Sequence, residues 1–141
     1  MTHPSGASAS TLLTFYEGSL TAVDLPTGAQ RWTFELPVKK RLARMPTMAI
    51  AAGRVFVCLE KGELFCLAEQ TGAPLWRQQL EGSWGRSAHE ALMGVFGHHL
   101  VLSQGGVLRC LDLDGRVLWE QEREVSAMGV DGVMVEYRES P

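Results

Sequence analysis

The sequence repeats itself with a period of about 44 residues, and this repeat restricts the possible folds more than any other feature. Each copy carries one turn glycine and one tryptophan: Gly18 and Trp32, Gly62 and Trp76, Gly106 and Trp119. The glycines are spaced by 44 residues, and the tryptophans by 44 and then 43. A four-stranded propeller blade needs about 40 to 50 residues, so the period predicts one blade per copy.

The repeated runs read as strands rather than helices. They are short, rich in Val, Leu and Phe, and separated by some of the 15 glycines of the chain. Almost no window shows the 3.6-residue period of an amphipathic helix, which disfavours helical repeats of similar length. Residues 55–59 are apolar at every position. A strand of that kind is expected where a blade lies between two neighbouring blades and neither face meets water.

The repeat divides the chain into units. A disordered tail is expected over residues 1–10, followed by units near 11–47, 48–91 and 92–125 and a partial unit at 126–138. The first unit lacks a convincing inner strand, and the last supplies only two strands. The sequence therefore predicts an all-β fold, a partial β-propeller of about three four-stranded antiparallel blades plus half a blade.

The first unit carries a recognisable motif. It resembles the AxDxxTGxxxW tryptophan-docking motif of PQQ-like (quinoprotein-type) β-propeller repeats through five residues, Ala22, Asp24, Thr27, Gly28 and Trp32. The second unit matches at Thr71, Gly72 and Trp76, with Cys66 at the alanine position and Ala68 at the aspartate position. The third matches at Asp112, Gly115 and Trp119, with Cys110 at the alanine position and one turn residue fewer. The resemblance implies that these residues are structural and that each tryptophan docks between adjacent blades.

The resemblance does not extend to the residues that bind the quinone cofactor. Quinoprotein dehydrogenases of this family have a complete ring, a vicinal Cys–Cys pair and acidic calcium ligands. No two of Cys58, Cys66 and Cys110 are adjacent, so we expect no PQQ, no metal, no other cofactor and no catalytic residue. The cysteines are expected to be small buried apolar residues. With a two-residue turn at Lys61–Gly62, Cys58 would lie opposite Phe65 and on the other sheet face from Cys66.

Three blades do not close a propeller. Rings form with about four to eight blades, so a three-blade wedge leaves two outer faces that need a cover. A homodimer would complete a six-bladed ring, with the spare strand at 127–132 filling the inner position of the partner's first blade. A larger partner protein that supplies the missing blades is the alternative. The extra strand at 133–137 is not explained by ring closure, and two alternatives are open: it pairs elsewhere, or it displaces residues 12–16.

Two connections between blades carry candidate partner-binding residues. The first holds four cations, Lys39, Lys40, Arg41 and Arg44, and the second holds Trp84 and Arg86. Because binding residues concentrate on loops, these side chains predict a basic, aromatic face for an acidic peptide, a phosphate-bearing ligand or a polar protein partner. The competing interpretation is a solvated loop with Trp84 filling a blade edge.

Charge and leader composition bear on partners and compartment. Thirteen basic and 16 acidic residues give a net charge of −3, which argues against nucleic-acid and membrane-surface binding. The first ten residues have no basic start and no apolar run, so we expect no signal peptide and a cytoplasmic protein. We expect a noncatalytic scaffold or adaptor that self-associates and binds a further protein. The alternative is an enzyme or small-ligand sensor with a site in the central channel formed by both chains.

Overall fold

The computed structural model describes residues 10–38, 45–81, 92–104, 106–122, 125–130 and 133–138. Its elements are 13 strands, all antiparallel, and the described residues contain no helix. The described part therefore contains no helix long enough and apolar enough to cross a membrane. The predicted tail lies outside the described residues, except for Ser10.

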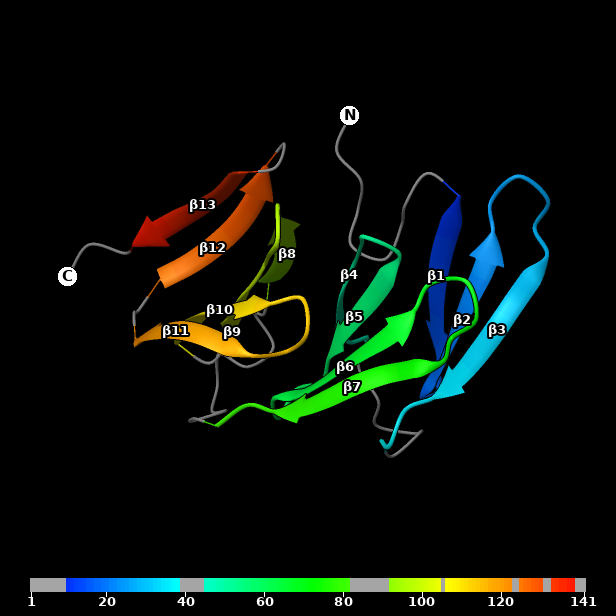
Figure 1. The fold of residues 1–141 in the computed structure, drawn as a ribbon, viewed down its shortest axis with the longest axis horizontal. Helices are drawn as coiled ribbons and strands as arrows, with labels where there is room; N and C mark the ends of the chain where they lie inside the picture. The colour runs from blue at the N-terminus through cyan, green and yellow to red at the C-terminus, as the bar shows by residue number, and fades with distance from the viewer. Residues whose placement is uncertain are drawn as a thin grey trace.

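The strands form four sheets that follow one another in chain order (Figure 1). The first sheet contains β1 (Thr11–Tyr16), β2 (Ser19–Asp24) and β3 (Gln30–Glu35). The second contains β4 (Thr47–Ala51), β5 (Arg54–Cys58), β6 (Glu63–Ala68) and β7 (Pro74–Gln79). The third contains β8 (Leu92–Phe96), β9 (His99–Gln104), β10 (Val107–Asp112) and β11 (Val117–Glu122). The last pairs β12 (Val125–Val130) with β13 (Val133–Arg138).

We call the first three sheets blade 1, blade 2 and blade 3. The inner strand β8 lies beside β4 on one side and beside β12 on the other, so the inner strands of successive units are neighbours. Blade 1 has three strands because no described strand precedes β1 in its sheet, and β12 with β13 forms the first half of a further blade. The partial propeller predicted from the sequence is confirmed.

The core consists of two layers, one between blades 1 and 2 and one between blades 2 and 3. Leu13 and Leu20 of blade 1 pack with Val55 and Val57 of blade 2 in the first layer. The second layer joins residues of blade 2, including Phe56, to residues of blade 3. Alternate residues of β5 thus enter opposite layers, which explains why its last four residues are all buried.

The turn glycines of the repeat have the backbone that their position needs. Glu17 and Gly18 connect β1 to β2 with φ of 46° and 85°, as in a two-residue type I′ hairpin turn. Gly62 and Gly106 occupy the equivalent place in blades 2 and 3, with φ of 85° and 78°. Glycine adopts this left-handed conformation without the steric cost that a side chain would add.

One expectation about the cysteines is wrong. Cys58 lies opposite Leu64 rather than Phe65, because residues 59–62 form a longer connection in which the Leu59 amide donates to the Glu63 carbonyl. Cys66 lies opposite Phe56, so Cys58 and Cys66 share one sheet face and enter the same core layer. All three cysteines are nevertheless free thiols.

Candidate functional site

The junction between blades 1 and 2 is built on an indole and a glycine. Trp32 of β3 is 8% exposed, and its Nε1–H donates to the Glu69 carbonyl oxygen at 2.8 Å. A Cβ placed on Gly72 would stand 2.6 Å from an indole carbon of Trp32. Only glycine leaves room for the ring here, and its φ of +74° is one that glycine adopts readily. The turn after β6 is therefore shaped to receive the tryptophan of the preceding blade.

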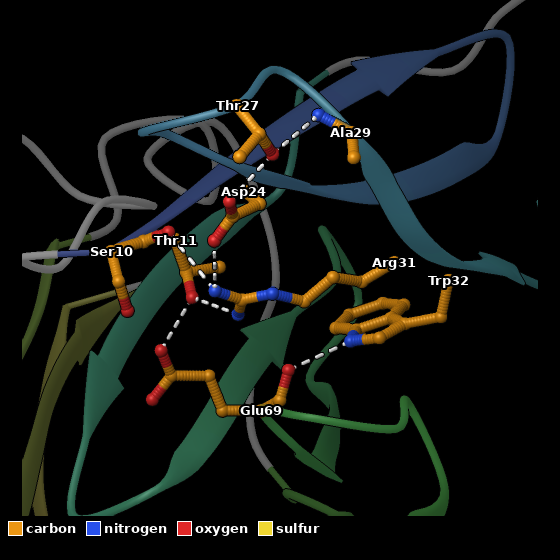
Figure 2. A network of polar contacts seen from close by, with 8 residues as sticks. All are labelled: Ser10, Thr11, Asp24, Thr27, Ala29, Arg31, Trp32 and Glu69. Carbon is orange, nitrogen blue, oxygen red and sulfur yellow. Dashed lines mark hydrogen bonds and ion pairs between the residues drawn. The ribbon is translucent and has the colours of Figure 1, made fainter.

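A polar network lies beside this indole (Figure 2). The Thr11 hydroxyl donates to Glu69 Oε2 at 2.6 Å and accepts from the Arg31 guanidinium at 2.5 Å. Arg31 also pairs with Asp24 at 2.9 Å, and Asp24 accepts from the Thr27 hydroxyl at 2.6 Å. The hydrogen bond from Thr27 and the one from Arg31 hold the pKa of Asp24 below its ordinary value of 3.8. The network joins the start of β1 to the turn of blade 2.

The junction between blades 2 and 3 repeats the same geometry. Trp76 Nε1–H donates to the Leu113 carbonyl at 2.9 Å, and a Cβ on Gly115 would stand 2.8 Å from its indole. Arg54 donates to the same carbonyl and pairs with Asp114 at 3.2 Å. The arginine thus takes the bridging role that Thr11 and Arg31 share at the first junction.

The two ends of the chain each present half of such a junction. Trp119 in β11 of blade 3 occupies the place of Trp32 and Trp76, but it is 43% exposed. Gly28 in blade 1 has the same φ as Gly72, +74°, and a Cβ built on it would meet nothing within 4 Å. Among the described residues, Trp119 is thus an indole with no turn packed on it, and the turn around Gly28 has no indole packed against it.

The outer faces beside these half-junctions are apolar in part. On β1, Leu12 and Tyr16 are exposed, and Leu25 is exposed in the turn after β2. On β11, Trp119 is the exposed apolar side chain. Exposed apolar side chains gathered on one face are typical of interaction surfaces rather than of solvated edges.

The candidate partner-binding residues all fall outside the described residues. They are Lys39, Lys40, Arg41, Arg44, Trp84 and Arg86. The described residues at the start of the two connections are equivalent: Leu36 and Leu80 are buried, and their amides donate to the carbonyls of Gly18 and Gly62 at 2.8 and 2.9 Å. Both connections therefore leave their blades from the same position.

Sequence reasoning missed several polar residues at the junctions. Arg109 of β10 is buried, pairs through Nε with Glu120 Oε2 at 2.6 Å, and donates to the Glu81 carbonyl. Gln104 of blade 3 donates to the Leu59 carbonyl of blade 2 at 3.2 Å. The sequence signal for Arg109 was its position between apolar residues of β10. A charged residue in such a run is seldom buried without a partner, so its position indicated a paired, buried arginine.

All three cysteines are buried thiols. Burial raises the pKa of Cys58 to about 12 and that of Cys66 to about 11. Burial also raises the pKa of Cys110. Because the thiolate is the nucleophile and metal-binding form, the raised pKa values of Cys58 and Cys66 disfavour both roles near neutral pH. Within the described ranges, no three His, Cys, Asp or Glu side chains gather as a metal-binding group.

Successive antiparallel sheets, stacked face to face with neighbouring inner strands, define the chain as a β-propeller protein, and its 44-residue unit is the PQQ-like repeat. Residues 16–136 match the sequence profile of the family described as outer membrane protein assembly factor BamB. The chain belongs to this family.

Solved structures share the fold. BamB from Moraxella catarrhalis has a TM-score of 0.66 and 23% identity, over 89% of this chain and 38% of that one. The computationally designed Ika8 protein has a TM-score of 0.69 and 16% identity, over 94% and 41%. A europium-containing methanol dehydrogenase has a TM-score of 0.58 and 17% identity, over 89% and 24%.

The chain spans less than half the length of each of these structures. No curated protein matches the sequence. The similar structures include a designed protein, a dehydrogenase and BamB, so the shared fold does not by itself select a function.

Proposed function

We propose that this chain is a noncatalytic protein-interaction scaffold that self-associates. The observation that carries the proposal is the pair of half-junctions: a 43% exposed Trp119 at one end and an open turn around Gly28 at the other. Both features recur inside the chain as well-packed contacts between blades. The description of the family as an assembly factor also favours a protein-binding role over catalysis.

The thiol chemistry supports a role without catalysis. The three cysteines are buried and their pKa values are raised, which disfavours a cysteine nucleophile. Native mass spectrometry of the purified protein tests this part of the proposal. We expect the mass of the polypeptide alone, and a stoichiometric small molecule retained by the protein would support a ligand sensor or an enzyme instead.

Self-association is tested by the absolute mass in solution. Light scattering over a concentration series should give twice the chain mass of 15.5 kDa at high concentration and a shift toward the monomer on dilution. A mass of 15.5 kDa at every concentration would overturn self-association. It would leave the scaffold role to a partner protein that supplies the missing blades.

We propose that a further partner binds the basic connections and that it presents acidic groups. Six residues would form this face: Lys39, Lys40, Arg41, Arg44, Trp84 and Arg86. The double substitution of Arg41 and Trp84 by alanine should abolish capture of that partner and leave the melting temperature unchanged. Unaltered capture would contradict the assignment.

We also propose a cytoplasmic location. Three free thiols fit a reducing compartment, because oxidising compartments favour paired cysteines. Fractionation of cells that produce the full-length protein tests this, with recovery outside the cytoplasmic fraction as the contrary result.

A further inference from the structure

The two internal junctions give a spacing rule for contacts between blades. In each one, the indole Nε1–H donates to a carbonyl 37 residues ahead, from Trp32 to Glu69 and from Trp76 to Leu113. Glu69 and Leu113 each directly follow the last residue of the strand before the turn, Ala68 in β6 and Asp112 in β10, although the blade 3 turn is one residue shorter. The rule therefore specifies which turn a docking tryptophan needs and which carbonyl of that turn accepts the hydrogen bond from its indole.

The turn of blade 1 meets the same specification. In blade 2, the Ala68 amide donates to the Ala73 carbonyl and the Gly72 amide to the Ala68 carbonyl, each at 2.8 Å. In blade 1, Asp24 makes the first of these bonds with Ala29 at 2.8 Å, and Gly28 makes the second with Asp24 at 2.7 Å. Since the two turns have the same bonds and the same φ at the glycine, the blade 1 turn is preformed for an indole. Its carbonyl at the acceptor place is that of Leu25.

The strands at the two ends are complementary as well. In blades 2 and 3, the strand equivalent to β1 pairs with an inner strand, as β5 does with β4 and β9 with β8. Among the described strands, β1 pairs with β2 alone. The inner strand β12 already lies beside β8, where the next blade of a ring would begin.

From this geometry we infer that two copies of this chain pack against each other. The Trp119 end of each copy covers the Gly28 end of the other copy. The Trp119 indole of one copy packs on Gly28 of the second copy and donates to its Leu25 carbonyl. The inner strand β12 of the first copy pairs with β1 of the second. Two such contacts close a six-bladed ring. This inference rests on the self-association proposed above and specifies its geometry.

The blade formed by β12 and β13 of one copy and by β1, β2 and β3 of the second copy would have five strands, one more than a four-stranded blade. The contacts of β1 and β13 indicate which strand is displaced. Thr11 and Leu13 fix β1 in the junction with blade 2, through the bond to Glu69 and through burial in the core layer. The strand β13 pairs with β12 alone in a two-stranded sheet. Because β1 is held by these contacts to blade 2 and β13 has one strand neighbour among the described strands, β13 is the strand that gives way.

Two substitutions at opposite ends test the inference. Trp119→Ala removes the indole, and Gly28→Asn places a Cβ where the indole would lie while tolerating the positive φ. Each should raise the dimer dissociation constant by roughly 30-fold or more, measured by light scattering over a concentration series.

Leu75→Ala and Gly53→Asn are the matched controls in blade 2. Leu75 is exposed like Trp119, and Gly53 has φ of +71° with nothing within 4 Å of its Cβ. Both controls should leave the dissociation constant within about 2-fold of the original value.

Mixing the two variants tests the direction of the contact. In a mixed dimer, the intact Trp119 of the Gly28→Asn chain meets the intact Gly28 of the Trp119→Ala chain, so one of the two contacts is restored. An equimolar mixture should therefore dimerise more tightly than either variant alone. A contact in which Trp119 packs on Trp119 of the partner would be insensitive to Gly28→Asn.

The outcomes separate this inference from the proposed function. A wild-type dimer that survives Gly28→Asn would overturn the indole-on-turn contact and leave self-association standing. A wild-type monomer at all concentrations would overturn both. Val135→Pro, which removes an amide from β13, should leave the dimer intact or tighten it, and loss of the dimer would show that β13 does not give way.

Discussion

The indole of Trp32 lies so close over Gly72 that a single added carbon on the glycine would stand 2.6 Å from the ring. Real Cβ atoms do not approach ring carbons this closely, so an added side chain must push two blades apart or displace a buried indole. The contact therefore joins a local requirement of the turn to the packing of two blades.

Gly72→Ala and Gly28→Ala should separate the cost of the turn from the cost of the contact. Both glycines have φ of +74°, so the backbone strain of an alanine is the same at each. Of these two glycines, Gly72 has the Trp32 indole packed on it, and Gly28 has nothing within 4 Å of its Cβ position. In a Trp119→Ala background that keeps the chain monomeric, we expect Gly72→Ala to lower the free energy of unfolding by about 1–3 kcal/mol more than Gly28→Ala. Urea unfolding measures the difference, and equal losses would contradict the packing argument.

Thr11→Val should show the value of the buried network at the first junction. The substitution keeps the shape and removes the hydroxyl that bridges Glu69 and Arg31. We expect the free energy of unfolding to fall by about 1–3 kcal/mol, because a buried hydrogen-bond partner is lost. Thr14→Val on the same strand is the control. Thr14 is exposed and its hydroxyl lies 3.4 Å from the Thr21 carbonyl, so its change should stay within about 0.5 kcal/mol.

Asp24→Asn should make the stability of the chain less dependent on acid. The pKa of Asp24 in the folded chain lies below its ordinary value of 3.8, because Thr27 and Arg31 stabilise the carboxylate. Its contribution to stability is therefore present above pH 3.8 and is lost as the pH falls through the lower, folded pKa. The stability difference between wild type and variant should be constant from pH 7 to pH 5 and shrink on further acidification. A difference that grows in acid would contradict the assignment.

The rate at which a thiol reagent labels the cysteines should be set by how often the chain opens, rather than by the intrinsic reactivity of the thiols. With the pKa of Cys58 near 12 and that of Cys66 near 11, neither thiol is ionised appreciably at pH 8, and both are buried. We expect a colorimetric disulfide reagent to label the cysteines of the native chain only as fast as the chain opens, and to label all three at once in denaturant. Rapid labelling of a native cysteine would be the contrary result.

Much of the fold could be predicted from the sequence because propeller blades have a strict period. The spacing of Gly18, Gly62 and Gly106 located three hairpins, and the tryptophans located the last strand of each blade. The face of Cys58 was predicted wrongly, because the glycine alone does not set the length of the connection. A connection one residue longer or shorter than assumed sends the following strand to the opposite face.

The junction networks could not be predicted in the same way. Thr11, Arg31 and Glu69 are far apart in the sequence and come from two blades, and none of them belongs to the repeated motif. The second junction uses Arg54 and Asp114 for the same purpose, so no common pattern marks the pair. The exposed Trp119 is the reverse case, since the sequence makes it equivalent to the buried Trp32 and the partly buried Trp76, and only the structure distinguishes it.

The contact between blades has a polarity, because the indole always belongs to the earlier blade and the turn to the later one. A contact with this direction between copies produces a closed ring only if the rotations from one copy to the next add up to a full turn. The tilt at the Trp32–Gly72 junction is one of the angles that set this rotation. Variants that open that angle without breaking the contact should add copies end to end and form extended polymers in place of a closed ring.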